Sequence, residues 1–450
     1  MERNLHELPD AAAGNPPKWN DVDDVALEIT AARPDPAMLD LPWELPLETW
    51  PEEHLAALPR GLSRHVVRFV KLSGRVLAVK EIKADIAARE YQMLRMLGRL
   101  DLPCVVPFGV VSGRTGLDGS PLDACLITRH LQFSLPYRAL FSQSLRPDTS
   151  TRLIDALAVL LVRLHLVGFW WGDVSLSNTL FRRDAGAFAA YLVDAETGEL
   201  HQSLTAGQRD HDLDIARVNI AGELMDLEAG GFLEAGVDPV DTSNRIVTRY
   251  AELWDELTGL ERFERGDRWR VDERIRRLNE LGFDVDELAI STDIGGTTIQ
   301  IQPKVVDAGH HSRRLLRLTG LDVEENQARR LLNDLDSFRA GTDRQNDDEE
   351  IVAHDWLQRI YEPITRTVPR DLAGKLEPAE LFHEVLEHRW YLSERAGHDV
   401  PIEDAIRDYV QTVLPSKPDE ATVVGVDTVE MPVVAMFEDT GDAPRPTPRR

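Results

Sequence analysis

Hydrophobic and polar residues alternate along two neighbouring stretches, residues 65–72 and 75–82. Alternation with period two places every second side chain on one face of a strand. The Ser73-Gly74 pair between the stretches suits a tight turn, so the pattern predicts a β-hairpin. Helical spacing of apolar residues predicts a helix at residues 85–97, and two further strands are predicted at residues 104–111 and 124–128.

A long apolar stretch from Ser150 to Leu166 predicts a buried helix, with Thr149 or Ser150 as its N-cap. Asp155, Arg163 and His165 interrupt the stretch. These charged and titratable residues make it unsuited to crossing a membrane, so no membrane span is expected.

The rest of the chain predicts a short hairpin around Asp184-Ala185-Gly186, a largely helical stretch to about Gly266, and a second hairpin around residues 294–297. Segments rich in Pro and Asp without periodicity are expected at both ends. The predicted organisation therefore has five parts: a loosely ordered segment at 1–40, a strand-rich lobe at 41–128, a helical lobe at 129–266, a mainly helical module at 267–414 and a disordered tail at 415–450.

Composition narrows the classes of function. A chain of 450 residues is too long to fold around one small hydrophobic core, so more than one domain is expected. Its net charge of −27 argues against nonspecific binding to nucleic acid or anionic membranes. Only Cys104 and Cys125 are present, which excludes a disulfide framework and a four-thiolate zinc site. The first residues lack the basic and apolar regions of a secretory signal, so a cytoplasmic location is expected.

A candidate lysine lies on the second predicted strand. Lys80 ends the alternating Leu77-Ala78-Val79-Lys80 run, and a helix follows. Glu81 would point to the opposite face of the strand, so Glu90, midway along the helix, is the better ion-pair partner. The alternative interpretation is a surface lysine and an exposed helix glutamate. A strand lysine fixed by a helix glutamate holds the α- and β-phosphates of ATP in kinases.

Three oxygen-bearing side chains form the candidate catalytic set. Asp173 is followed five residues later by Asn178, and Asp194 ends the apolar strand beyond the predicted hairpin. Phosphoryl transfer in kinase-like folds needs a residue that orients the acceptor hydroxyl and two oxygen ligands for magnesium. We assign Asp173 to the first role, and Asn178 and Asp194 to the second. Helix capping and turn formation are the alternative roles.

Three further residues are candidates for contact with the nucleotide. Residues 126–131 occupy the position where a kinase hinge presents backbone groups to adenine, which makes Thr128 and His130 candidates. Gly61 is the only glycine in the place of a phosphate-covering loop, because no Gly-x-Gly-x-x-Gly precedes the lysine strand. Asp212 or Asp214 either braces the catalytic loop or caps a helix.

The motif His165-x-x-Gly168…Gly172-Asp173-x-x-x-x-Asn178 resembles the catalytic loop of the lipopolysaccharide-kinase branch of the protein-kinase-like superfamily. Asp194-Ala195-Glu196 stands where typical kinases have Asp-Phe-Gly. The chain resembles an uncharacterised actinobacterial family more closely. Three segments carry this resemblance: Ser134–Tyr137, residues 171–178 and residues 194–199. That resemblance extends to about Asp334, whereas the kinase resemblance covers about residues 63–227.

The sequence and the resemblance together predict an α+β protein: a two-lobed kinase-like domain followed by a mainly helical module with one β-hairpin. The expected activity is ATP- and Mg²⁺-dependent phosphorylation of a hydroxyl on a sugar or glycan, another small molecule, or a protein. The alternative is a pseudokinase that binds nucleotide or regulates a partner, and a protein partner for the helical module is also expected. The resemblance does not identify lipopolysaccharide as the substrate.

Three other patterns are interpreted structurally. The Asp293-Ile294-Gly295-Gly296-Thr297-Thr298 run resembles a sugar-kinase phosphate loop, but it is better explained as a hairpin turn. Adjacent His310 and His311 rarely converge on one metal ion, so hydrogen-bonding roles are expected. A basic cluster is expected to pair with carboxylates of the chain, although docking of a phosphate or substrate is a second option: Arg313, Arg314, Arg317, Arg329 and Arg330.

Overall fold

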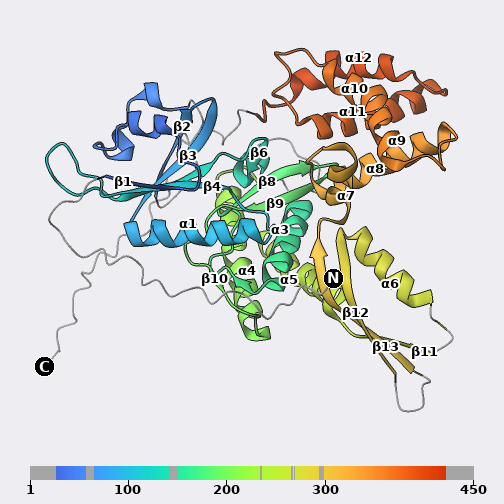
Figure 1. Cartoon of the computed structure of the whole chain (residues 1–450), viewed down its shortest axis with the longest axis horizontal. Coiled ribbons are helices and arrows are strands. Elements are labelled where there is room, and N and C mark those ends of the chain that lie inside the picture. The colour runs from blue at the N-terminus through green and yellow to red at the C-terminus, as the bar shows by residue number, and fades with distance from the viewer. Residues whose placement is uncertain are drawn as a thin grey trace, which may run out of the picture. The chain divides into compact units, whose positions relative to one another are not determined.

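The structure is a computed structural model, and it describes residues 27–56, 65–141, 149–233, 236–264, 267, 269–292 and 298–421. The described residues belong to two compact units. The first comprises the chain to Ala56, His65–Tyr91 and Pro107–Arg129, and the second includes Gln92–Val106 and everything from His130 onward. Helices and small sheets occur throughout, so the protein is α+β as expected (Figure 1).

The first unit is built on a five-stranded antiparallel sheet in the order β1-β4-β5-β3-β2. The hairpin expected from the alternating pattern is present, and helix α1 (Ala84–Arg99) follows its second strand. Residues 104–106, expected as the start of a strand, belong to the second unit, where Cys104 forms an isolated bridge with Leu192, and the strand itself begins at Pro107. The strands are β1 (Glu28–Ala31), β2 (Val66–Leu72), β3 (Arg75–Ile82), β4 (Pro107–Ser112) and β5 (Ala124–Arg129).

Residues 27–40 are the described part of the stretch expected to be loosely ordered, and they are structured instead: strand β1 pairs with β4, and the 3₁₀ helix η1 (Pro36–Asp40) follows. Two further 3₁₀ helices, η2 (Leu47–Thr49) and η3 (Glu52–His54), come after residue 40. Buried side chains from residues 38–50 pack in one cluster with residues of the sheet, and they include Met38, Trp43 and Trp50. Elements this short leave no helical periodicity in the sequence, which is why the pattern missed them.

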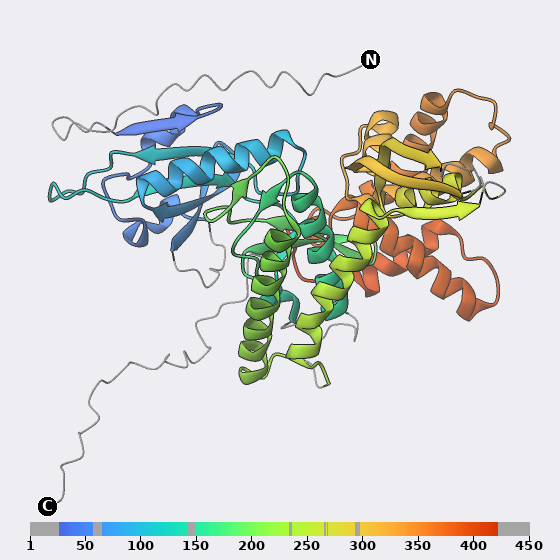
Figure 2. The ribbon, with the colours of Figure 1, turned by 90° about the horizontal axis from the view of Figure 1, so that it is seen from below.

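The second unit starts with short strands and long helices. Helix α5 packs against both α3 and α4 (Figure 2). The expected hairpin is present as β8 and β9, which turn at Ala185-Gly186. The elements are β6 (Ser134–Pro136), α2 (Tyr137–Phe141), α3 (Thr149–Leu166), β7 (Phe169–Trp170), β8 (Thr179–Asp184), β9 (Ala187–Leu192), β10 (Glu199–Leu200), α4 (Ala206–Ala229) and α5 (Pro239–Thr258).

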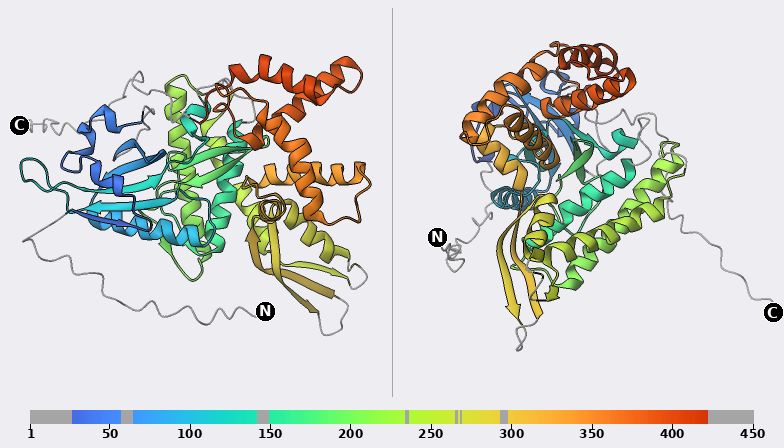
Figure 3. Two further views of the ribbon diagram at one scale, coloured as in Figure 1. Left: turned by 45° about the horizontal axis from the view of Figure 1, so that its top comes forward. Right: turned by 90° about the vertical axis from the view of Figure 1, so that its right-hand side faces the viewer.

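The helical module contains the second expected hairpin, formed by β12 and β13, although its tip at residues 293–297 lies outside the described residues. β11 adds a third strand beside β13. The long hairpin extends from the start of α7, and the helices after it form a bundle of their own (Figure 3). The elements are β11 (Glu261–Glu264), α6 (Trp269–Glu280), β12 (Phe283–Thr292), β13 (Thr298–Ala308), α7 (His310–Thr319), α8 (Glu325–Gly341), α9 (Glu349–Trp356), the π-helical turn η4 (Leu357–Tyr361), α10 (Glu362–Arg366), α11 (Pro378–Ala396), α12 (Ile402–Thr412) and η5 (Leu414–Ser416).

The mainly helical module contacts the helical lobe through ion pairs. The end of β8 contributes Arg182 and Arg183 to ion pairs with Glu324, Glu377 and Glu420. Glu420 is buried, so the part of the predicted tail between residues 415 and 421 is fixed on this surface. We call this contact the hairpin junction. Among the described residues, no helix is both long and apolar enough to cross a membrane.

Candidate functional site

The strand lysine of the first unit has the expected partner. Lys80 lies on β3, which is flanked by β2 and β5, and its Nζ is 3.1 Å from Oε2 of Glu90 on α1. Glu90 is only 1% exposed, and a buried carboxylate requires an opposite charge. The strand–helix arrangement therefore fixes the lysine ammonium on the side of the sheet that α1 covers.

Glu81, the carboxylate next to Lys80 in the sequence, has different partners. Glu81 contacts Arg114, whose Nη1 lies 2.6 Å from Oε1 of Glu81, and it also accepts the backbone N–H of Leu47. The Arg114 side chain is fully buried and donates to the carbonyl of Trp43 as well. Glu81 therefore fastens the N-terminal segment to the sheet, which leaves Glu90 as the partner of the lysine.

The expected hinge coincides with the division between the two units. Thr128 pairs with Ala78 near the end of β5, and His130 is the first residue of the second unit after that strand. Burial lowers the pKa of His130. Gly61, the remaining nucleotide-binding candidate, lies outside the described residues.

In the second unit, the segment from Gly172 to Asn178 forms a tight loop. Gly172 has φ +76°, and a Cβ there would lie 2.9 Å from the Trp170 ring, so only glycine fits without strain. The Asn178 amide Nδ2 donates to both the carbonyl and Oδ2 of Asp173, at 3.0 Å each. Because its side-chain nitrogen is engaged, the side-chain oxygen Oδ1 of Asn178 is the atom left to bind a cation.

Helix α4 braces this loop through Asp212, which settles the choice between bracing and capping. Asp212 is completely buried, and it accepts the backbone N–H groups of Trp171 and Gly172 at 2.8 Å. The N-cap of α4 is Thr205, and Asp214 is exposed beside Arg217. Asp212 therefore has a structural role that extends across 40 residues of sequence.

A histidine links the same brace to the next helix. His165 Nε2 lies 3.1 Å from Oδ2 of Asp212, and its Nδ1 lies 2.8 Å from the hydroxyl of Tyr250 on α5. A carboxylate only accepts, so Nε2 donates to Asp212, and in the neutral ring Nδ1 then accepts from the Tyr250 hydroxyl. Burial raises the pKa of Tyr250, which keeps this hydroxyl protonated. The motif histidine thus joins α3, α4 and α5 behind the loop.

Two further bracing residues were not predicted. Glu223 accepts the backbone N–H groups of Leu176 and Ser177 at 2.8 and 2.9 Å, and Asn219 donates to the Val174 carbonyl at 3.1 Å. Burial raises the pKa of Glu223, although these N–H donors oppose the shift. The available signal was helical spacing: positions 212, 219 and 223 fall on one face of α4.

The third residue of the candidate set is tied to the same loop. The Trp171 indole donates to the backbone carbonyl of Asp194 at 2.8 Å, and the Val193 N–H donates to the backbone carbonyl of Asn178 at 3.1 Å. Glu196, which was not assigned as a ligand, places a carboxylate oxygen within 4.8 Å of one from Asp194. Two carboxylates at this separation form an oxygen donor set suited to Mg²⁺.

Among the described residues, the two adjacent histidines and one arginine of the basic cluster each contact a carboxylate. His310 Nδ1 contacts Asp284 at 2.5 Å, and His311 Nδ1 contacts Glu325 at 2.7 Å. Arg313 pairs with Asp284 and Asp307. The hydrogen-bonding interpretation of both histidines is therefore confirmed, and so is carboxylate pairing for this arginine.

Comparison with known proteins adds a family match for part of the chain. Residues 252–414 match the family described as "Domain of unknown function (DUF4032)". The matched stretch begins inside α5, so it includes the end of the helical lobe as well as the module. The search of curated proteins returned no match.

A structure titled "WaaP in complex with acyl carrier protein" is similar to this chain at 16% sequence identity and a TM-score of 0.34. The match covers 56% of this chain and 99% of the other. A TM-score this low carries no argument about activity. The fold and site define an α+β protein with a lysine–glutamate pair in one unit and a braced Asp–Asn loop in the other.

Proposed function

We propose that this protein is an ATP- and Mg²⁺-dependent phosphotransferase of the protein-kinase-like fold, with a hydroxyl of a sugar, another small molecule or a protein as acceptor. The observation that carries the proposal is the braced loop. Asp173, Asn178 and the Asp194–Glu196 pair belong to segments joined by hydrogen bonds, and the side-chain oxygen Oδ1 of Asn178 is left for a cation.

The order of elements in the first unit supports the same class. Protein kinases carry the phosphate-binding lysine on their third strand and its glutamate partner on the helix that follows. Lys80 and Glu90 occupy a strand and the next helix in this order, and they are paired. The lysine would hold the α- and β-phosphates, while Glu90 would keep its ammonium oriented.

The loop residues would divide the chemistry. Asn178, Asp194 and Glu196 fit a magnesium ion by donor type, and such an ion would neutralise charge on the phosphates. Asp173 would accept the proton of the acceptor hydroxyl. Its Oδ2 accepts from Asn178, and Asn219 lies 3.4 Å from its Oδ1, so its carboxylate is oriented before an acceptor arrives.

A regulatory pseudokinase is the second candidate, and two observations favour it. No Gly-x-Gly-x-x-Gly run precedes the lysine strand, so backbone amides have fewer ways to close over phosphates. The module also uses buried ion pairs to hold the helical lobe, which suits a protein that transmits binding to a partner.

Nucleotide binding is tested first by thermal unfolding with ATP, with and without Mg²⁺. We expect Mg²⁺-ATP to raise Tm by about 2 °C or more in the wild type and in the control Asp214→Ala, since Asp214 is exposed. Asp194→Ala should lose the shift. An identical Mg²⁺-dependent shift in Asp194→Ala would contradict the metal assignment.

Catalysis is tested next by ATP turnover in the presence of candidate acceptors. Asp173→Asn should lower kcat by about 10²–10³-fold while ATP still binds, because the acceptor proton then has no base. Binding without any turnover in the wild type would favour the pseudokinase. Unchanged turnover in Asp173→Asn would exclude the role given to this residue.

A further inference from the structure

A second candidate site surrounds the tip of the β8–β9 hairpin, within the second unit. Gly186 forms the turn, and the adjoining pocket of about 260 Å³ is lined by Arg152, Arg329, Arg330, His383 and Glu387 among others. These residues come from α3, α8 and α11. Pockets for drug-sized ligands are usually about 300–1,000 Å³, so this one suits a smaller molecule.

The charge of the pocket is opposite to that of the chain. The protein has 78 acidic and 51 basic residues, yet this lining has three arginines and a histidine against one carboxylate, Glu387. Within the described part of the chain, neither Arg330 nor His383 lies at ion-pair distance from a carboxylate. Adjacent cations repel one another, and a bound anion would relieve that repulsion.

Three nitrogen donors converge on the space beside Gly186. A Cβ on this residue would lie 3.8 Å from Arg152 Nη1, 3.9 Å from His383 Nε2 and 4.0 Å from Arg330 Nη2. Because residue 186 is glycine, no side chain fills that point. The three nitrogens therefore surround one point beside the Gly186 backbone at van der Waals distance, and Arg152 Nη1 also donates to the Gly186 carbonyl.

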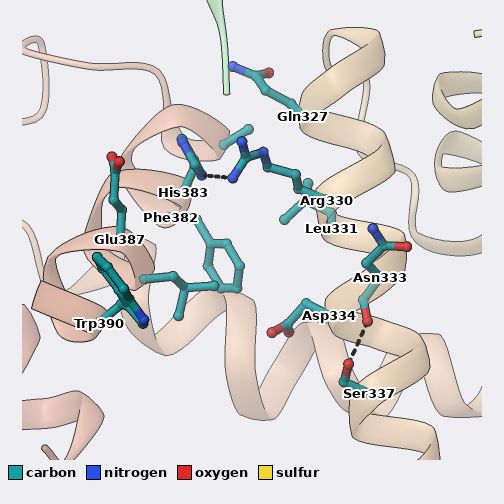
Figure 4. Close-up of a pocket in the computed structure, with 12 residues that line it drawn as sticks. Gln327, Arg330, Leu331, Asn333, Asp334, Ser337, Phe382, His383, Glu387 and Trp390 are labelled. Atoms are coloured by element: carbon teal, nitrogen blue, oxygen red, sulfur yellow. Dashed lines mark hydrogen bonds between the residues drawn. The ribbon is translucent and has the colours of Figure 1, made fainter. Parts of the chain in front are cut away.

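The hydrogen-bond pattern fixes which atom of His383 donates. Arg330 Nη1 lies 3.3 Å from His383 Nδ1, and an arginine can only donate, so Nδ1 accepts (Figure 4). In the neutral ring the proton is then on Nε2, the nitrogen nearer Gly186. Burial lowers the pKa of His383, which favours this neutral form. In Figure 4 the His383 ring lies between Arg330 and Glu387 in this view.

We propose that this hairpin-tip pocket binds the phosphoryl group of a small phosphorylated molecule. Arg330 supplies a guanidinium fork that matches phosphate oxygens, Arg152 supplies a second charge, and His383 donates from Nε2. The site is distinct from the Asp173 loop, and its existence does not depend on catalysis.

The test uses the full chain and titration calorimetry at constant ionic strength, with inorganic phosphate, glucose 6-phosphate and glucose as probes. We expect saturable binding of at least one phosphate-bearing probe and none of glucose. Tighter binding of glucose 6-phosphate identifies a phosphomonoester as the ligand, and equal or tighter binding of inorganic phosphate identifies the free anion. No saturable binding of either overturns the proposal.

Matched variants locate the binding. Arg330→Gln should weaken it at least about tenfold, whereas Arg317→Gln should not change it, because Arg317 is an exposed arginine of α7 outside the pocket. Glu387→Gln should tighten it about threefold by removing the only lining carboxylate. A merely structural role of Arg330 would not produce these opposite effects.

Two results would place the anion elsewhere and overturn the proposal. One is equal affinity in the wild type and in Arg330→Gln. The other is loss of phosphate binding in Asp194→Ala with retention in Arg330→Gln, which would assign the phosphate to the nucleotide site. The side chains of Arg330 and Asp194 are at least partly exposed, so both variants should fold. Arg330→Lys, which keeps the charge but loses the fork, should bind at intermediate strength.

Discussion

The braced loop and the hairpin junction are both buried polar networks in the second unit, but they are built differently. At the loop, carboxylates of α4 accept backbone N–H groups of residues 171–177. At the junction, two adjacent arginines of β8 pair with carboxylates that come from three separate parts of the chain. The first network shapes one segment, and the second fastens distant segments together.

The difference has a thermodynamic consequence. A carboxylate that accepts backbone N–H groups can be replaced only by another acceptor, because the N–H groups remain. An ion pair can be replaced as a whole by neutral side chains, since both charges disappear together. The loop should therefore tolerate few substitutions, while the junction should tolerate matched ones.

The largest effect is expected at Arg182. Its guanidinium pairs with Glu324 and Glu377, so Arg182→Met removes the cation that pairs with two largely buried carboxylates. We expect a loss of about 4 kcal/mol in the free energy of unfolding, measured by urea denaturation. The triple variant Arg182→Met/Glu324→Gln/Glu377→Gln should recover most of it. No recovery would mean that the junction depends on its hydrogen bonds rather than on charge balance.

A somewhat smaller loss is expected at Asp212. Asp212→Ala removes the acceptor of two backbone N–H groups and of His165, and should cost about 3 kcal/mol. Asp214→Ala on the exposed side of the same helix should change stability by less than about 0.5 kcal/mol. The measurement is the free energy of unfolding of the two variants. Similar losses in both would mean that Asp212 does not hold the loop in place.

The junction should also make stability depend on pH. Asp184 accepts N–H groups of Asn326 and Gln327 at the start of α8, yet complete burial and the nearby Glu324 carboxylate raise the pKa of Asp184 to about 7. A raised carboxyl pKa means that the folded state binds the proton more tightly. The resulting stability is fully present below about pH 4 and is lost as the pH rises toward about 7.

The measurement compares Tm across pH 4–7 for the wild type, Asp184→Asn and Asp336→Asn. The fall in the free energy of unfolding attributable to Asp184 should be about 3 kcal/mol, and it should be absent from Asp184→Asn because the amide does not titrate. Asp336 is exposed on α8, so Asp336→Asn should keep the wild-type profile. A wild-type profile in Asp184→Asn would assign the pH dependence to other carboxylates.

The smallest effect is expected at Glu223. Glu223→Gln keeps one acceptor oxygen but loses the other, so one of the Leu176 and Ser177 N–H groups loses its partner, at a cost of about 1 kcal/mol. Hydrogen exchange should become faster at these two amides and stay unchanged in Glu228→Gln, whose side chain is exposed on the same helix. If exchange at both amides stays slow in Glu223→Gln, Glu223 does not stabilise the loop.

Local patterns predicted much of the fold. Alternation over residues 65–82 predicted β2 and β3, and apolar spacing predicted α1 and α3, because each signal lies within one element. The Lys80–Glu90 pairing also followed from the two faces of a strand. The 3₁₀ helices of the N-terminal segment were missed, since three to five residues cannot show a period.

The sequence by itself determined the chemistry of the candidate site, because its residue types and spacing fall within short segments. Tertiary structure alone decided what holds that site: Asp212, Asn219 and Glu223 reach the loop from 40 or more residues away. It also decided the hairpin junction, where the partners of β8 lie 142 to 237 residues further along the chain. Spacing constrains neighbours within one helix or strand, whereas contacts at such separations exist only once the elements have packed.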